Sequence, residues 1–127
     1  MATIAGTIRD CTLLSKTFHG TGAREVWQIA VDFAAYTLGT DDASLVGIGA
    51  AINATARSGG TRTLRWGACG QPGRDTNGQA VYFGGASVNA CTVSSDDLTG
   101  DLNDAAVAEI TTTAVSGMQM IVAVDVS

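Results

Sequence analysis

Charged residues are scarce in this chain of 127 residues. They make up 15% of it, with seven Lys and Arg against twelve Asp and Glu, and the net charge is −5. Binding to nucleic acid needs clustered cations that neutralise phosphates, and docking on anionic lipid needs a basic patch. The composition therefore predicts neither nucleic acid nor a membrane as a partner. Soluble domains usually carry about 25% charged residues, so we expect much of this surface to contact other protein.

Long apolar runs and paired cysteines are also missing. The first residues contain neither a cationic leader nor an apolar run, so we expect no signal peptide. The longest apolar stretches, 46–52 and 120–124, fall far short of the roughly 18 residues of a membrane span. Cys11, Cys69 and Cys91 are odd in number and have no C-x-x-C spacing. We expect them to be small core residues of a protein assembled in a reducing cytoplasm.

No combination of residues in the sequence predicts a catalytic or metal-binding site. His19 is the single histidine, and it lies in a glycine-rich turn without a G-x-S-x-G motif, so Ser–His or Cys–His catalysis is not expected. The acidic residues of the last third lack the spacing of a calcium loop, and we expect them to form a solvated edge that caps a helix: Asp96, Asp97, Asp101, Asp104 and Glu109. We predict that the protein is not an enzyme and binds no cofactor or metal.

Short strands dominate what the sequence does contain. The clearest is 24–35, where one apolar face alternates with a mixed face. Its apolar face consists of Trp27, Ile29, Val31, Phe33 and Ala35. Further strands are predicted at 2–8, 11–18, 61–68, 79–83, 86–93 and 118–126, with the polar pair Arg9-Asp10 separating the first two. Turn residues assign Cys69–Gly78 to an exposed loop and Gly84-Gly85 to a hairpin turn.

One helix is predicted near residues 42–57, with Asp41 or Asp42 as its N-cap and Gly59 or Gly60 at its C-terminal end. A second, short helix is expected from Asn103 or Asp104 to about Ile110. Together these elements predict a single mainly β (α+β) domain over residues 1–127. Its fold would be an antiparallel sandwich or a partly closed barrel of about six to eight short strands with one inserted helix.

Aromatic and cationic side chains on the predicted strands are assigned to the core and to ion pairs. The five aromatics expected in the core are Trp27, Phe33, Trp66, Tyr82 and Phe83. Arg62 and Arg65 alternate in direction along their strand, so salt bridges are favoured over a continuous basic face for the group Arg57, Arg62, Arg65 and Arg74.

Assembly contacts are predicted at the N-terminal strand and at the loop Cys69–Gly78. Ile4 and Ile8 fall on one face of a terminal strand, which is suited to a sheet edge. Arg74 in the loop offers a directional donor to a partner carboxylate, and Tyr82 is a candidate aromatic anchor. The candidate interface therefore consists of Ile4, Ile8, Arg74 and Tyr82. The alternative is that the N-terminus pairs within its own sheet and the loop is free in solvent.

Several segments occur in an order that is familiar. D-D-A-S-L-V-G-I-G-A-A-I-N-A-T-A-R-S-G-G leads into T-R-T-L-R-W, and G-R-D-T-N-G-Q-A-V-Y leads into A-S-V-N-A-C-T-V. The segment S-S-D-D-L-T-G-D-L-N-D-A-A-V-A-E-I then precedes a terminal strand of small residues. This order, over most of residues 24–126, resembles the short Ala/Gly/Thr-rich structural proteins that accompany major capsid proteins in tailed bacteriophages.

The resemblance implies a head decoration (cement) protein that binds the major capsid protein. It would stabilise the capsid surface of the virion as a homo-oligomer, for example a trimer, after synthesis in the host cytoplasm. It transfers no functional residue, because this group of proteins has no motif to match. Two alternatives remain open: a tail-tube or head–tail joining subunit, and a carbohydrate-binding or adhesin-like module that uses the Cys69–Gly78 loop and nearby aromatics.

Overall fold

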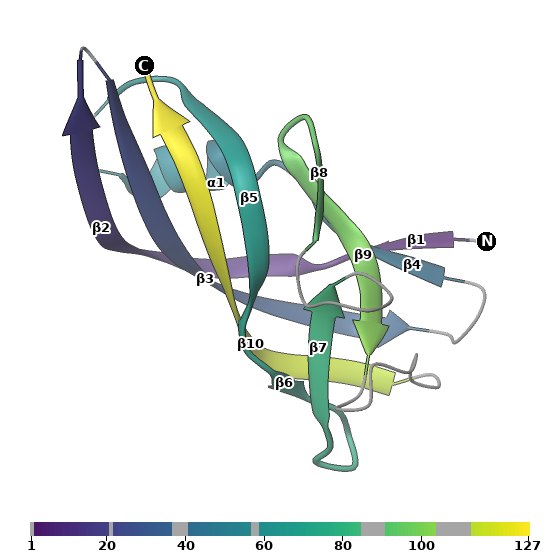
Figure 1. Cartoon of the computed structure of the whole chain (residues 1–127). Coiled ribbons are helices and arrows are strands. Elements are labelled where there is room, and N and C mark those ends of the chain that lie inside the picture. Colours follow the sequence, from purple (N-terminus) through teal and green to yellow (C-terminus); the bar gives the residue numbers. More distant parts are fainter. Residues whose placement is uncertain (1, 21, 37–40, 57–58, 85–90, 104–112) are drawn as a thin grey trace.

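A computed structural model describes residues 2–20, 22–36, 41–56, 59–84, 91–103 and 113–127. These residues form a curled sheet, shaped as a half-barrel, and one short helix (Figure 1). The elements are β1 (Ala2–Ala5), β2 (Thr7–His19), β3 (Gly22–Tyr36), β4 (Asp41–Leu45), α1 (Ile48–Thr55), β5 (Arg62–Gln71), β6 (Gly73–Arg74), β7 (Ala80–Gly84), β8 (Thr92–Ser94), β9 (Asp97–Asn103) and β10 (Thr113–Val126). The predicted mainly β fold with one inserted helix is confirmed.

The strand order of the sheet is β1-β4-β9-β7-β6-β10-β3-β2, with β5 also beside β10 and β8 beside β9. The pairs are antiparallel except for β1 and β4, which are parallel, so the sheet is mixed rather than wholly antiparallel. Strands β2, β3, β10 and β5 run side by side as one curved layer (Figure 1). Helix α1 contacts both outer strands of this layer, β5 and β2, and so lies within its curve.

The first strand breaks at Gly6 and not at Arg9-Asp10, where the sequence predicted a separation. A Cβ at Gly6 would lie 2.7 Å from Leu45 Cδ2 and 2.9 Å from Phe33 Cε1, so only glycine fits at this crossing. Here the chain leaves its pairing with β4 and begins its pairing with β3. Arg9 is instead the extra residue of a β-bulge within β2, and Leu14 is the extra residue of a second bulge.

The core lies between the concave side of the half-barrel and α1. The alternating face predicted for β3 is buried at Trp27, Ile29, Val31 and Phe33, while the side chain of Ala35 lies outside the described residues. The Phe33 and Phe83 rings meet edge to face with their centroids 5.4 Å apart. The neighbouring strand β10, which pairs with β3, buries four residues beside these side chains: Met118, Met120, Val122 and Val124. The predicted face of β10 is therefore confirmed for these four residues.

Helix α1 is shorter than the predicted helix of 42–57, because residues 41–45 form strand β4. Gly47 adopts a left-handed backbone (φ 68°) that turns the chain from strand to helix. The N-terminal amides are capped from a distant turn, whereas Asp41 and Asp42 belong to strand β4. Asp96 Oδ1 accepts from Gly49 N at 2.9 Å, and Asp97 Oδ1 accepts from Gly47 N at 3.0 Å. The sequence predicted that the acidic segment caps a helix near Asn103 or Asp104, but the helix that Asp96 and Asp97 cap is α1.

Replacement of Asp96 by alanine is expected to lower the free energy of unfolding by about 1–2 kcal/mol. The variant loses the acceptor for Gly49 N and the longer bond at 3.4 Å from Ala50 N. Asp96→Asn keeps one acceptor oxygen and should lose less than half as much. Urea unfolding of both variants measures the difference. Equal losses in the two variants would contradict the capping role of the side-chain oxygen.

Three further predictions from the sequence need correction or fall outside the described residues. Cys69–Gln71 belong to β5 and Gly73–Arg74 to β6, so the exposed loop shrinks to a turn in which Asp75 Oδ1 accepts from Asn77 N and Gln79 N. Of the predicted strand 86–93, residues 86–90 lie outside the described residues, and 92–93 belong to strand β8 (Thr92–Ser94). Gly85, most of the predicted helix after Asn103, and Arg57 lie outside the described residues.

Candidate protein interface

Trp66 lies on the outer side of the sheet, contrary to its predicted place in the core. Leu64 pairs with Val124 and Trp66 pairs with Ala123, so Arg65 is an extra residue that shifts the alternation of β5. Leu64 is consequently buried, whereas Trp66 keeps 47% of its surface exposed. Exposed tryptophan on a sheet is typical of contact surfaces, because the ring offers a large apolar area. The β-bulge therefore moves an aromatic anchor from the core to the surface.

The face that carries Trp66 is the convex side of strands β5, β10, β3 and β2, here called the outer sheet face. Its middle contains uncharged and mostly apolar side chains that are partly buried by their neighbours: Val26, Gln28, Ala30, Ala68, Gln119, Ile121 and Ala123. The face lies on the side of the sheet opposite α1 and the core. An apolar centre with an exposed aromatic residue is the usual anatomy of a protein–protein interface.

Ion pairs lie at the two ends of the outer sheet face. At one end Arg24 Nε and Arg65 Nε donate to the two carboxylate oxygens of Asp125, at 2.8 Å and 2.7 Å. These hydrogen bonds, first that from Arg24, outweigh the effect of burial and lower the pKa of Asp125 to about 2. At the other end Arg9 Nη1 donates to Asp32 Oδ2 at 3.0 Å. The prediction that the arginines form salt bridges is confirmed for Arg62 and Arg65.

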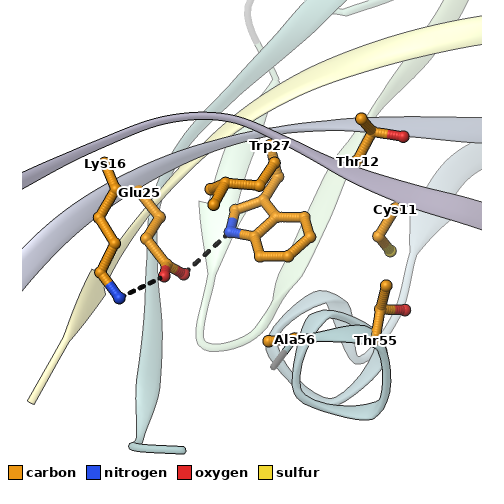
Figure 2. Close-up of a pocket in the computed structure, with 8 residues that line it drawn as sticks. Cys11, Thr12, Lys16, Glu25, Trp27, Thr55 and Ala56 are labelled. Atoms are coloured by element: carbon orange, nitrogen blue, oxygen red, sulfur yellow. Dashed lines mark hydrogen bonds and ion pairs between the residues drawn. The ribbon is translucent and has the colours of Figure 1, made fainter. Parts of the chain in front are cut away.

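A pocket of about 410 Å³ opens on the concave side, between β2, β3 and the end of α1 (Figure 2). Its wall is mainly apolar and includes Cys11, Thr12, Leu13, Trp27, Thr55 and Ala56. Figure 2 shows Glu25 between Lys16 and the indole of Trp27, joined by one dashed line to the Lys16 nitrogen and by another to the ring nitrogen. A neighbouring pocket of about 220 Å³ shares Lys16 and is lined by Phe18, which is 75% exposed.

Glu25 is the buried centre of an ionic cluster next to this pocket. Its carboxylate accepts from Arg62 Nε at 2.7 Å and from Trp27 Nε1 at 2.9 Å, and Lys16 Nζ lies 3.2 Å from Oε2. Arg62 Nη1 also donates to Asn53 Oδ1 at 2.8 Å, which ties α1 to the cluster. Burial alone would raise the pKa of Glu25, but the hydrogen bonds from Arg62, Trp27 and Lys16 lower it to about 2. The carboxylate therefore stays ionised at neutral pH and is a poor general base.

The three thiols are not activated as nucleophiles. Burial raises the pKa of Cys11 and of Cys69, and it raises the pKa of Cys91 to about 12 with a smaller contribution from the nearby Cys69. Thiolate is the reactive form, so these cysteines behave as neutral, partly buried side chains at neutral pH. All three pack against the core, as the sequence predicted. The side chain of His19 lies outside the described residues.

The four residues predicted as an interface do not form one patch. Ile4 and Ile8 are partly buried and pack against the core. Ile4 lies on β1, which ends the strand order of the sheet but pairs with β4 of its own chain, and Ile8 lies on β2, which pairs with β3. Arg74 is exposed on β6 and donates to Gly78 O at 3.3 Å within its own turn, while Tyr82 is partly buried on the adjacent β7. Contacts through these residues stay a prediction.

Among the described residues, no three or more His, Cys, Asp or Glu side chains are grouped so that they could hold a metal ion. In the same part of the chain no helix has the length and apolar character to cross a membrane. Comparisons of the sequence with protein-family models and with curated proteins, and of the fold with solved structures, gave no match. The functional argument therefore rests on the chain's own surfaces.

Proposed function

We propose that this protein is a non-enzymatic structural subunit of a virus particle, which binds the major capsid protein and stabilises the shell as a decoration protein. The observation that carries the proposal is the outer sheet face, with its uncharged middle and the exposed ring of Trp66. Such a face on a chain with only 15% charged residues suits a subunit that is covered by other protein in an assembly. The resemblance of the sequence to small phage head proteins supplies the kind of assembly.

The described titratable groups support a role without chemistry. Glu25 and Asp125 are held as carboxylates by arginine partners, and the thiols stay protonated. The two carboxylates hold strands together: Glu25 links β3 to β5 through Arg62, and Asp125 links β10 to β3 and β5. A subunit of a shell needs this cross-strand rigidity.

Co-sedimentation with shells tests the proposal. Purified chain is mixed with empty shells assembled from the major capsid protein encoded with it, and the pelleted stoichiometry is measured. We expect saturable binding, visible by electron microscopy as density at regular positions on the shell lattice. Trp66→Ser should reduce the amount bound by roughly tenfold or more, because the outer sheet face loses its exposed aromatic ring. Asn77→Ser, at an exposed turn, is the matched control.

Failure to pellet with shells at any concentration would contradict the decoration role. Rings or tubes formed by the chain alone would support the tail-tube or head–tail joining alternative. The exposed Trp66 ring, beside Arg65 and Asp125, also favours a second candidate, a carbohydrate-binding module that stacks a sugar on the indole. Glycan-array binding that is lost in Trp66→Ala with the fold intact, together with no shell binding, would establish that candidate.

A further inference from the structure

Side chains on the outer sheet face form rows across the strands, and the two middle rows carry no charge. One row holds Trp66, Ala123 and Val26, and the next holds Ala68, Ile121 and Gln28. A third row holds Gln119, Ala30 and, on β2, Asp10, which begins the charged end of the face. Gln28 Nε2 donates to Gln119 Oε1 at 3.0 Å, so the two amides already bond to each other. Covering these rows with protein would bury apolar surface and leave few polar groups without a partner.

The two ends of the outer sheet face carry opposite charge. Two arginines and one aspartate, Arg24, Arg65 and Asp125, leave a side-chain charge of +1 at the first end. Arg9 with Asp10 and Asp32 leaves −1 at the other end. Beyond this second end, Arg74 on β6 and Asp75 in the following turn cancel each other. The rows without charge lie between the two ends.

We propose that the outer sheet face binds the same face of a second copy of this chain, in a dimer with two-fold symmetry. A two-fold axis that crosses the strands near the Ile121–Gln28 row places the positive end of each copy on the negative end of its partner. The same rotation places Trp66 of one copy over the row of Gln119 in the other. Gly70 lies next to this row on β5 and has no side chain that would cover it. An added Cβ at position 70 would lie 2.6 Å from Ile121 Cγ1, on the outer sheet face.

The size of the face agrees with a weak dimer. Four strands spaced about 4.8 Å apart, each contributing about eight residues of about 3.3 Å, present roughly 500 Å² per copy. Two such faces bury at most roughly 1,000 Å² in total, the lower limit for a specific interface, and less where the convex faces separate toward their borders. We therefore expect a weak dimer that dissociates at roughly 100 μM or above. This inference names one partner for the proposed assembly role and rests on that proposed function.

Sedimentation equilibrium of the full chain tests the dimer in the absence of shells. Over about 5 μM to 1 mM we expect a reversible monomer–dimer equilibrium that weakens as salt is added. Gln28→Arg places the arginines of the two copies opposite each other at the axis and should raise the dissociation constant by roughly tenfold or more. Asn77→Arg adds the same charge at an exposed turn and should leave the constant within about twofold. Circular dichroism and thermal midpoints verify that both variants fold.

A charge exchange tests the orientation. The stated axis keeps each strand over its own counterpart, so Arg24 on β3 faces Asp32 on β3 of the other copy. Arg24→Glu makes both ends of the face negative and should weaken the dimer by roughly fivefold or more. Adding Asp32→Lys to that variant makes the second end positive, so the double variant should regain most of the lost affinity. Restoration of this kind is expected only if the two ends face each other between copies.

Three results would overturn the inference: a monomer at every concentration, a dimer whose dissociation constant is unchanged by Gln28→Arg, or a trimer as the smallest assembly. Shell binding is measured separately and decides the proposed function. A chain that dimerises as described and never pellets with shells contradicts the decoration role and leaves the dimer standing. A chain that pellets with shells and stays monomeric in solution supports the decoration role and contradicts the dimer.

Discussion

Glu25→Gln is expected to lower the free energy of unfolding by about 3–5 kcal/mol and the thermal midpoint by roughly 10 °C or more. The carboxylate is 1% exposed and is the acceptor for Arg62, whose side chain is equally buried. Removal of its charge leaves the Arg62 guanidinium buried beside a neutral amide and also weakens the contact with Lys16. Breaking a buried pair is costly because one ion remains without compensation.

Asp32→Asn is the matched control, because it makes the same chemical change in the exposed pair with Arg9. That pair has 60% and 29% of its side-chain surfaces exposed, so the loss should stay below about 1 kcal/mol. The double variant Glu25→Met, Arg62→Met should recover much of the loss, since it removes both buried charges and fills the space with apolar atoms. A loss below about 1 kcal/mol in Glu25→Gln would contradict the role assigned to the cluster.

Acid unfolding provides a second readout of the same variant. The pKa of Glu25 falls from an ordinary 4.5 to about 2 in the folded chain, so its contribution is present above pH 4.5 and is lost as the pH falls toward 2. This loss is about 3 kcal/mol for the wild type. Glu25→Gln should lack most of this slope and keep the smaller part that Asp125 contributes in the same pH range. An unchanged acid profile would show that Glu25 titrates normally.

Gly100→Ala is expected to destabilise the chain by about 3 kcal/mol or more. A Cβ at this position would lie 2.5 Å from the carbonyl oxygen of Gly84 and 3.0 Å from its carbonyl carbon. Both atoms belong to the backbone of β7, so no side-chain rotation can relieve the clash, and β7 and β9 must separate. Urea unfolding measures the loss.

Gly59→Ala is the control for Gly100→Ala. A Cβ at Gly59 meets nothing within 4 Å, and the backbone is not left-handed there. This substitution should be neutral or stabilise the chain by up to about 1 kcal/mol, because alanine restricts the unfolded chain. If the two alanine variants had the same stability, the close approach of β7 and β9 could not be a constraint on the fold.

The sequence predicted the β class and the buried face of β3 because apolar and polar residues alternate along this long strand. That alternation matches the burial as long as the strand pairs with its neighbour without a bulge. Trp27, Ile29, Val31 and Phe33 are paired without a shift until Val31, and all four are buried. The same rule failed at Trp66, where one extra residue in β5 reverses the faces. A bulge depends on how the strand pairs with its partner, and the alternation within one strand carries no information about that pairing.

The ionic cluster and the cap of α1 were missed for a related reason. Glu25 continues the alternation of Trp27 toward the N-terminus, so its inward direction could have been read from the sequence. Its partner Arg62 lies 37 residues away and becomes adjacent only when β5 and β3 pack around α1. The Asp96 cap likewise depends on a turn 47 residues from Gly49. Local helix signals therefore placed the start at Asp41 or Asp42, in what is a strand.

The two bulges of β2, at Arg9 and Leu14, have a consequence for how copies of this chain can grow into larger structures. A long regular strand at the border of a sheet accepts another strand, and repetition of that contact gives open-ended fibres. The bulges interrupt the spacing of free amides and carbonyls along β2, and Lys16 points to the concave side between them and the strand end. Growth by strand addition is thereby discouraged, whereas a contact between sheet faces about a two-fold axis closes on itself after two copies.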